Sequence, residues 1–135
     1  MYYATMNNAA FFSLFLFLSA ARGEPCLAQA GDLDPLRLQG RWTLVSTNGK
    51  PAASPAAFFE ISGRQIRGFD GCNSFGGSLD RADLIRKTER DCPGMDPFPL
   101  DLADPLGQLN AANLEADILS LPVRGQVGIA VFRRN

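Results

Sequence analysis

The sequence predicts a single small α+β domain, a mostly antiparallel sheet of six or seven short strands with one short helix. Three observations lead to this prediction. The chain has 135 residues, which is enough for one domain. Short segments rich in β-branched and aromatic residues recur and are separated by Gly, Asn and Pro turn signals. A helical spacing of leucines appears shortly after residue 100.

The first thirty residues are expected to be a signal peptide. Residues 9–21 form an apolar block, which is shorter than the roughly 20 residues that a membrane-spanning helix needs. Residues 28–30, Ala-Gln-Ala, supply small side chains at the positions that a signal peptidase reads. We therefore expect cleavage after Ala30, which leaves residues 31–135 as the mature domain.

An uncleaved leader that anchors the chain is the alternative, because residues 1–8 lack the Lys or Arg with which signal peptides usually begin. Cys26 raises the question of lipid anchoring. The Gly-Glu-Pro sequence before it differs from the small apolar residues that precede a lipidated cysteine. We therefore expect a periplasmic or secreted protein that is not anchored as a lipoprotein through Cys26.

The first half of the mature domain is expected to contain three strands. The first of them alternates roughly by two, which places Trp42 and Leu44 on one face and Trp42 in the core. Asn-Gly and Ser-Gly pairs are turn signals, and two prolines indicate a loop. The expected strands are residues 41–47, 57–61 and 64–69, with turns at 48–49 and 62–63 and a loop at 50–55.

The second half is expected to contain a hairpin, the helix and two closing strands. Leu102, Leu106 and Leu109 recur at helical spacing. Asp104 as N-cap and Pro105 in the first turn would begin this helix. The expected elements are strands at 75–80 and 82–87, a helix at 105–112, and strands at 114–122 and 126–133.

A glycine-rich stretch, residues 68–77, lies at the centre of the domain. A phosphate-binding loop would end in Gly-Lys-Ser/Thr, and a dinucleotide-binding turn would follow a parallel strand; neither pattern is present. We expect structural roles instead. Gly71 and the pair Gly76 and Gly77 would permit positive φ and close backbone approach. Asn73 would bond nearby backbone or adopt a left-handed conformation.

This stretch and three other segments together resemble the META domain, of the heat-shock protein HslJ type. The matching segments are residues 38–44 with 48–51, the central Gly71-Cys72-Asn73-Ser74-Phe75-Gly76-Gly77, Thr88 with Cys92, and residues 119–121 with 131–133. The resemblance covers residues 38–133 and implies a small α+β domain, exported or lipoprotein-anchored in bacteria. It also implies an association with heat or envelope stress and no established enzymatic activity. Three prolines, at 97, 99 and 105, predict a shorter helix than the family usually has.

Cys72 and Cys92 are the two cysteines that remain in the expected mature domain. In an exported protein they favour a structural disulfide. A closed loop of about 20 residues would add roughly 3 kcal/mol to stability on the chain-entropy model. Two buried free thiols are one alternative. Redox or metal chemistry is another, although redox pairs usually lie two residues apart at a helix N-terminus.

The composition restricts the possible chemistry. The chain contains no histidine, which excludes Ser-His and Cys-His nucleophile pairs within it. The net charge of -1 provides no electrostatic footprint for nucleic acid. We therefore expect no enzymatic activity, no catalytic residue, no cofactor and no bound metal.

Two groups of charged residues are candidate functional sites, but each is expected to be an ordinary solvated surface. Four aspartates in the proline-rich segment lack the regular spacing of a calcium loop, so they are expected to be solvated rather than catalytic or calcium-binding. Four arginines could form a basic strip across neighbouring strands, but a solvated sheet face is the expected interpretation. The two groups are Asp91, Asp96, Asp101 and Asp104, and Arg64, Arg67, Arg86 and Arg90.

These observations predict a non-enzymatic, exported META-like domain that is related to envelope stress or acts as a binding module. Its partner would be an unknown envelope protein or a small ligand, and it would touch a membrane only through an uncleaved leader. One alternative is a small exported hydrolase inhibitor that uses the Cys92–Pro99 loop as its inserted segment. Another is an enzyme that uses carboxylates alone. The sequence identifies neither the partner nor the oligomeric state.

Overall fold

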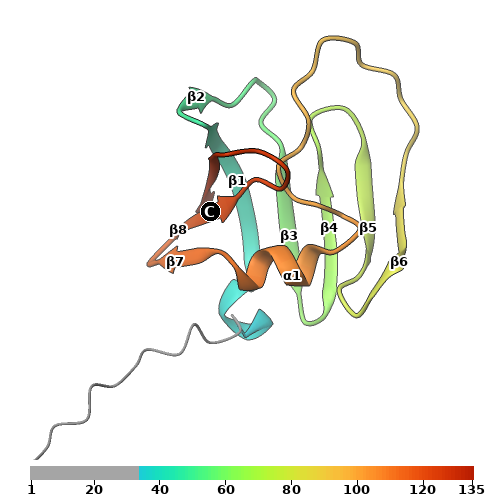
Figure 1. The fold of residues 1–135 in the computed structure, drawn as a ribbon. Coiled ribbons are helices and arrows are strands. Elements are labelled where there is room, and N and C mark those ends of the chain that lie inside the picture. The colour runs from blue at the N-terminus through green and yellow to red at the C-terminus, as the bar shows by residue number, and fades with distance from the viewer. Residues whose placement is uncertain (1–33) are drawn as a thin grey trace, which may run out of the picture.

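The structure is a computed structural model that describes residues 34–135. The expected signal peptide, its cleavage after Ala30 and Cys26 lie outside the described residues. The described chain begins with a 3-10 turn and then forms one antiparallel sheet of nine strands and one short α-helix (Figure 1). The predicted fold class, a small α+β domain dominated by an antiparallel sheet, is therefore confirmed.

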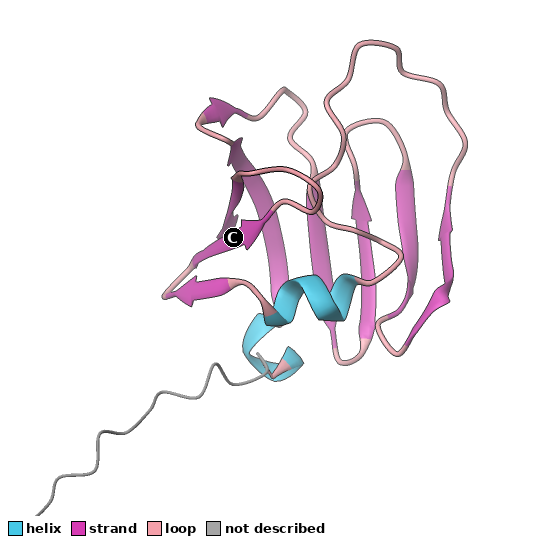
Figure 2. Cartoon of the chain, in the orientation of Figure 1, coloured by secondary structure: helices cyan, strands magenta, loops and turns pink. Residues whose placement is uncertain are grey.

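The elements follow one another with short connections, except for the long loop between β6 and α1 (Figure 2). In chain order they are η1 Pro35–Leu38, β1 Gly40–Thr47, β2 Lys50–Pro51, β3 Phe58–Ser62, β4 Gln65–Phe69, β5 Ser74–Ser78, β6 Arg81–Lys87, α1 Pro105–Asn110, β7 Asn113–Glu115, β8 Ile118–Pro122 and β9 Ile129–Arg134.

The sheet has the order β6-β5-β4-β3-β1-β9-β8-β7, with β2 paired to β1. The first long strand and the last strand of the chain are therefore neighbours in the middle of the sheet. Their register places Leu44 opposite Phe132 and Trp42 opposite Arg134. β6 and β7 form the two edges. Helix α1 lies across one face of the sheet in Figure 1, and we call the opposite face the outer face.

Two strands in excess of the expected seven come from features that the sequence pattern concealed. The expected strand at residues 114–122 is broken into β7 and β8 by a turn in which Ala116 has a φ of +51°. Alanine is not a turn signal, so the pattern predicted one continuous strand. The second additional strand, β2, lies in the expected loop and pairs Lys50 with Thr47.

Two boundaries also differ from the prediction. The helix ends at Asn110 rather than at residue 112, because the amide of Ala111 bonds to the carbonyl of Gln108 in a tighter final turn. The last strand begins at Ile129 rather than at residue 126. Before it, the amide of Val123 donates to the carbonyl of Gly128 at 3.1 Å and closes a turn.

The core lies between the inner face of the sheet and α1. Trp42, Phe59 and Phe132 are fully buried, and the rings of Phe59 and Phe132 meet edge to face at 5.1 Å between centroids. Trp42 Nε1 donates to the carbonyl of Leu38 at 2.9 Å, so its one polar atom is satisfied. From α1, Leu109 is 1% exposed and closes the core. The expected core position of Trp42 is confirmed.

The long loop between β6 and α1 returns the chain to this core. Phe98 packs against Phe75 at 5.6 Å and Phe132 at 6.3 Å between ring centroids, and Leu100 is buried. The end of the loop is thereby fixed on the inner face. Within residues 34–135, no helix has the length and apolar character needed to cross a membrane.

Candidate functional site

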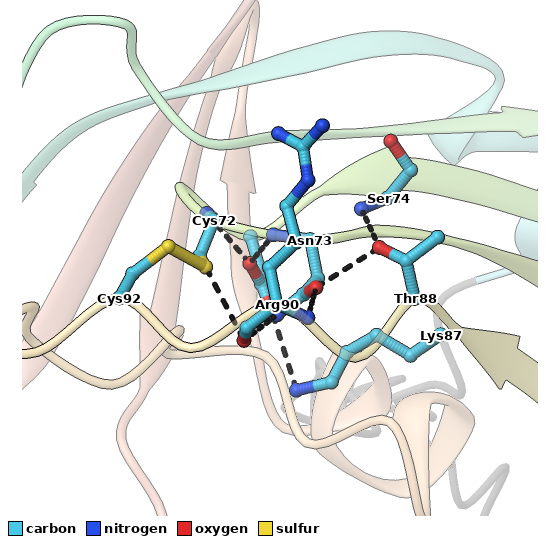
Figure 3. The surroundings of a disulfide bond; sticks show 8 residues. Cys72, Asn73, Ser74, Lys87, Thr88, Arg90 and Cys92 are labelled. Carbon is cyan, nitrogen blue, oxygen red and sulfur yellow. Dashed lines mark hydrogen bonds and ion pairs between the residues drawn. A yellow bond between two sulfur atoms is a disulfide. The ribbon is translucent and has the colours of Figure 1, made fainter.

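Two segments that are distant in sequence meet at what we call the clasp, which consists of Asp70, Cys72, Asn73, Lys87, Thr88, Arg90 and Cys92 (Figure 3). Cys72 and Cys92 form a disulfide with an S–S distance of 1.96 Å. The structure thus joins the pair that the sequence analysis expected. Cys72 Sγ also lies 3.6 Å from the carbonyl oxygen of Arg90. This is a contact rather than a hydrogen bond, since a disulfide sulfur carries no proton.

Asn73 holds the clasp together through its side chain. Its Oδ1 accepts from the amide of Arg90 at 2.6 Å and from Thr88 Oγ1 at 2.9 Å, and its Nδ2 donates to the carbonyl of Arg90 at 3.2 Å. The side chain is buried, and both of its polar atoms have partners. Asn73 therefore bonds backbone 17 residues away rather than nearby, and it does not take the left-handed conformation.

Asp70 and its partner Lys87 are the clasp residues that sequence reasoning missed. Asp70 Oδ1 accepts from the amides of Cys72 at 2.9 Å and Asn73 at 2.6 Å, and its carboxylate lies 3.2 Å from Lys87 Nζ. Burial favours a higher pKa for Asp70, but the two amides and Lys87 outweigh burial and the pKa is lowered. An aspartate two residues before a central cysteine was the local signal, because Asp bonds the backbone two residues on.

The glycines of residues 68–77 have distinct roles. Gly71 has a φ of +102°, as expected, and a Cβ on Gly77 would lie 2.7 Å from the Cα of Ile85. Gly76 has no positive φ, and a Cβ placed on it would have its nearest contact at an ordinary 3.6 Å. The expectation was therefore wrong for Gly76.

Neighbouring strands approach the backbone most closely at Gly68, which was not among the expected residues. A Cβ there would overlap the carbonyl oxygen of Phe58 and the ring of Phe75. Phe75 itself, a motif residue, is buried in the core. Only the paired strands reveal this constraint, because Phe58 and Phe75 reach Gly68 from the strands on either side.

Beside the clasp, the loop at residues 95–99 separates two hollows. The large hollow has a volume of about 910 Å³ and extends from the clasp to the turn before β9. The second, of about 370 Å³, faces the segment between β2 and β3. In the Cys92–Pro99 loop, residues 93–97 are exposed, whereas Phe98 is half-buried and Pro99 is buried.

Cations and carboxylates line the large hollow mostly as pairs. The nitrogen-to-oxygen distances are 3.2 Å for Lys87–Asp70, 2.7 Å for Lys50–Asp96 and 3.0 Å for Arg124–Asp101. Arg90 is different, since no carboxylate of residues 34–135 lies within 4 Å of it. Its guanidinium extends away from the disulfide in Figure 3.

The four aspartates of the proline-rich segment do not form one cluster. Asp96 pairs with Lys50, and Asp101 shares Arg124 with Asp104. Asp104 is the predicted N-cap of α1 and accepts from the amide of Gly107 at 3.0 Å; Arg124 and this amide lower its pKa. Among residues 34–135, no three Cys, Asp or Glu side chains lie together as metal ligands would.

The four arginines likewise separate. Arg67 on β4 and Arg86 on β6 lie in one cross-strand row, on either side of Gly76. Arg64 occupies the turn before β4 and pairs with Asp80. Arg90 lies in the clasp. The expected strip therefore retains two of its four members.

The fold and the clasp define a small single-sheet α+β domain whose central stretch is bonded to the loop after β6. The family model of the META domain matches residues 34–134, and the chain therefore belongs to the META domain family. The resemblance stated for residues 38–133 is confirmed. No curated protein and no solved structure matches the chain significantly.

Proposed function

We propose that this META-domain protein is a non-catalytic, exported binding module that acts in envelope stress. Its binding site is the large hollow beside the clasp, and its ligand is a small molecule or a segment of an envelope protein. The observation that carries the proposal is the hollow itself. Its volume of about 910 Å³ falls within the range of ligand sites, on the order of 300–1,000 Å³.

The walls of the hollow support binding, because they are held in place before any ligand arrives. The disulfide and Asn73 fix the side formed by the clasp, and Phe98 anchors the side formed by the loop. Preorganised walls reduce the entropy lost on binding. Apolar side chains such as Leu100 and Val123 share the lining with 11 polar or charged residues out of 21, so the hollow suits a ligand that carries polar or charged groups.

The charges of the hollow support a non-catalytic role. A general acid or base needs a pKa near the working pH, which for a carboxyl group means a raised pKa. Asp70, the most buried carboxylate of the hollow, has a lowered pKa instead. Asp96 and Asp101 each face a cation. The chain also has no histidine to serve in their place.

The test is purification of the tagged protein from its native envelope, followed by mass spectrometry under non-denaturing conditions. We expect wild type to carry a bound molecule that is released on denaturation. Arg90→Glu should lose it, because Arg90 is the one cation of the hollow that has no carboxylate partner among residues 34–135, and the change reverses its charge. Arg37→Glu is the matched control, since Arg37 is exposed and does not line the hollow.

Retention of the molecule by Arg90→Glu would contradict the assignment of the site. Recovery of a hydrolase that the protein blocks would support the inhibitor hypothesis instead. Reproducible turnover of a substrate, lost when one polar residue of the hollow is changed, would overturn the non-catalytic role.

Export and stress have separate tests. The mature protein isolated from the envelope fraction should begin at Gly31, and recovery of the uncleaved chain would contradict the expected cleavage. A deletion strain should grow more slowly than wild type at raised temperature or under envelope damage. Equal growth under both conditions would remove stress from the proposed role.

A further inference from the structure

The outer face of the sheet carries a row of charged residues that the proposed function does not use. Across β1, β3, β4, β5 and β6, the residues paired in register are Arg41, Glu60, Arg67, Gly76 and Arg86. Buried residues such as Phe59 and Ile66 alternate with this row along the strands. The row therefore points away from α1 and into solvent.

This row is basic although the whole chain has a net charge of -1. Glu60 pairs with Arg67 at 2.8 Å, and the Arg67 side chain is still 73% exposed. Arg41 and Arg86 have no carboxylate within 4 Å among residues 34–135. Arg86 Nη1 donates to the backbone carbonyl of Asp83 at 3.1 Å. Three arginines against one glutamate give the row a net charge of +2, and its complement is an anionic partner.

Gly76 has no side chain, so the backbone is exposed in the middle of the row. Packing does not require glycine at this position, since a Cβ would make only ordinary contacts of 3.6 Å or more. Glycine in a strand interior often marks a site where a ligand approaches the backbone closely. Arg67 and Arg86 flank Gly76 from the two adjacent strands, about 10 Å apart at the backbone.

The neighbouring side chains indicate the type of anionic partner. Leu84 lies on β6 two residues before Arg86, alternates with the inward Ile85 and is 46% exposed. A surface that combines basic and exposed apolar side chains suits the interface of a membrane. It suits single-stranded nucleic acid poorly, because bases need a free aromatic face to stack on. The ring of Phe58 is covered by the guanidinium of Arg41 at 3.6 Å.

We propose that the outer face docks on an anionic phospholipid bilayer, with lipid phosphates bound over Gly76 between Arg67 and Arg86. Docking uses the face opposite α1, so the large hollow stays open to its ligand. The inference goes beyond the proposed function and does not depend on it. It also goes beyond the expectation that only an uncleaved leader would contact a membrane.

The test is vesicle sedimentation with the chain from Gly31 onward. This chain holds every residue of the described fold and lacks the apolar leader segment, which would bind lipid by itself. We expect binding to vesicles of phosphatidylglycerol mixed with phosphatidylcholine, and none to phosphatidylcholine alone. Binding should disappear at about 1 M salt, where the screening length falls to about 3 Å.

Variants locate the site. Each basic residue near an anionic surface contributes a factor of about 5 to binding, so Arg86→Gln should bind about 5-fold more weakly and Arg67→Gln/Arg86→Gln about 30-fold. Arg37→Gln, an equal change of charge away from the row, should bind as wild type does. Gly76→Ala should fold and bind, whereas Gly76→Asp should fold and lose binding, because its carboxylate would occupy the phosphate position.

Equal binding by Arg86→Gln and Arg37→Gln would overturn the proposal. Binding to phosphatidylcholine alone would overturn it too. So would saturable binding of inorganic phosphate, single-stranded DNA or an acidic protein by a chain that ignores anionic vesicles. Circular dichroism of each variant establishes that a loss of binding is not a loss of fold.

Discussion

At the scale of single residues, Gly68 and Gly76 lie eight positions apart in the sequence and differ in what surrounds them. Gly68 lies against the carbonyl oxygen of Phe58 and the ring of Phe75, whereas Gly76 has ordinary van der Waals space around its Cα. Both lie in strands and neither has a positive φ. Steric space alone therefore decides which of them tolerates a side chain.

Gly68→Ala is expected to destabilise the fold by about 1–3 kcal/mol, because overpacking moves backbone or a core ring. Gly76→Ala is expected to change stability by no more than about 0.5 kcal/mol, as a surface change does. Urea denaturation of both variants measures the difference. Equal stability of the two would contradict the close approach at Gly68.

Asn73→Ala is expected to reduce stability by about 2 kcal/mol, because it leaves the partly buried amide and carbonyl of Arg90 without their partner. Ser74→Ala is the control, since Ser74 contributes only its backbone groups to this network. Urea denaturation of the oxidised proteins measures both. An Asn73→Ala variant as stable as the control would show that water replaces the lost bonds.

Asp70 should make stability depend on acid pH. Its folded pKa lies below the unfolded value of about 3.9, so its contribution is fully present above the unfolded pKa and is lost as pH falls through the folded pKa. Asp70→Asn keeps an acceptor for the two amides but removes the charge. The variant should be less stable than wild type at pH 7, and the difference should shrink as pH falls below the unfolded pKa of about 3.9 and through the lowered folded pKa.

Urea denaturation across this pH range measures the effect. A difference that stays constant with pH would assign the loss to packing rather than to the charge of Asp70.

At the scale of elements, the disulfide joins the turn between β4 and β5 to the loop that precedes α1. The loop is already attached at two other places, through the bonds of Asn73 to Arg90 and through the packing of Phe98. Removing the disulfide should therefore loosen the exposed residues 93–97 before it releases the ends of the loop.

Cys72→Ala/Cys92→Ala is expected to reduce stability by about 3 kcal/mol, the chain-entropy value for a loop of this length. Hydrogen exchange of residues 93–97 should accelerate most. Wild type from Gly31 onward, unfolded without reductant, should show no titratable thiol. Two titratable thiols would mean that Cys72 and Cys92 are not paired in the isolated protein.

At the scale of the whole molecule, β1 and β9 occupy the centre of the sheet and β6 and β7 its edges. Central strands have hydrogen-bonded neighbours on both sides, and the buried side chains of Trp42 and Phe132 lie on them. An edge strand bonds on one side only. Protection from hydrogen exchange follows this order, since local opening needs fewer broken contacts at an edge.

We therefore expect amides of β1 and β9 to exchange most slowly, near the rate of global unfolding. Amides of β6 should exchange much faster, and β7 should resemble β6. Native-state hydrogen exchange with mass spectrometry measures these rates. Slow exchange throughout β6 in the free protein would indicate that another chain covers this edge.

Local signals in the sequence were sufficient for several features. Strands β1, β3 and β4 lie within one residue of the expected 41–47, 57–61 and 64–69, because alternation and turn residues act within a few positions. The start of the helix follows from Asp104 and Pro105, which cap it locally. The Cys72–Cys92 pair follows from counting the cysteines that remain if residues 1–30 are a cleaved signal peptide, as the sequence predicts.

What the sequence determined by itself was therefore the fold class, most elements and the family. The pairing of β1 with β9, the constraint at Gly68, the partners of Asn73 and the row on the outer face were decided by the tertiary structure. The physical reason is the distance along the sequence over which each interaction acts. Periodicity, capping and turn preferences depend on neighbours in the chain, whereas these contacts form between segments that only the assembled sheet and its long loop bring together.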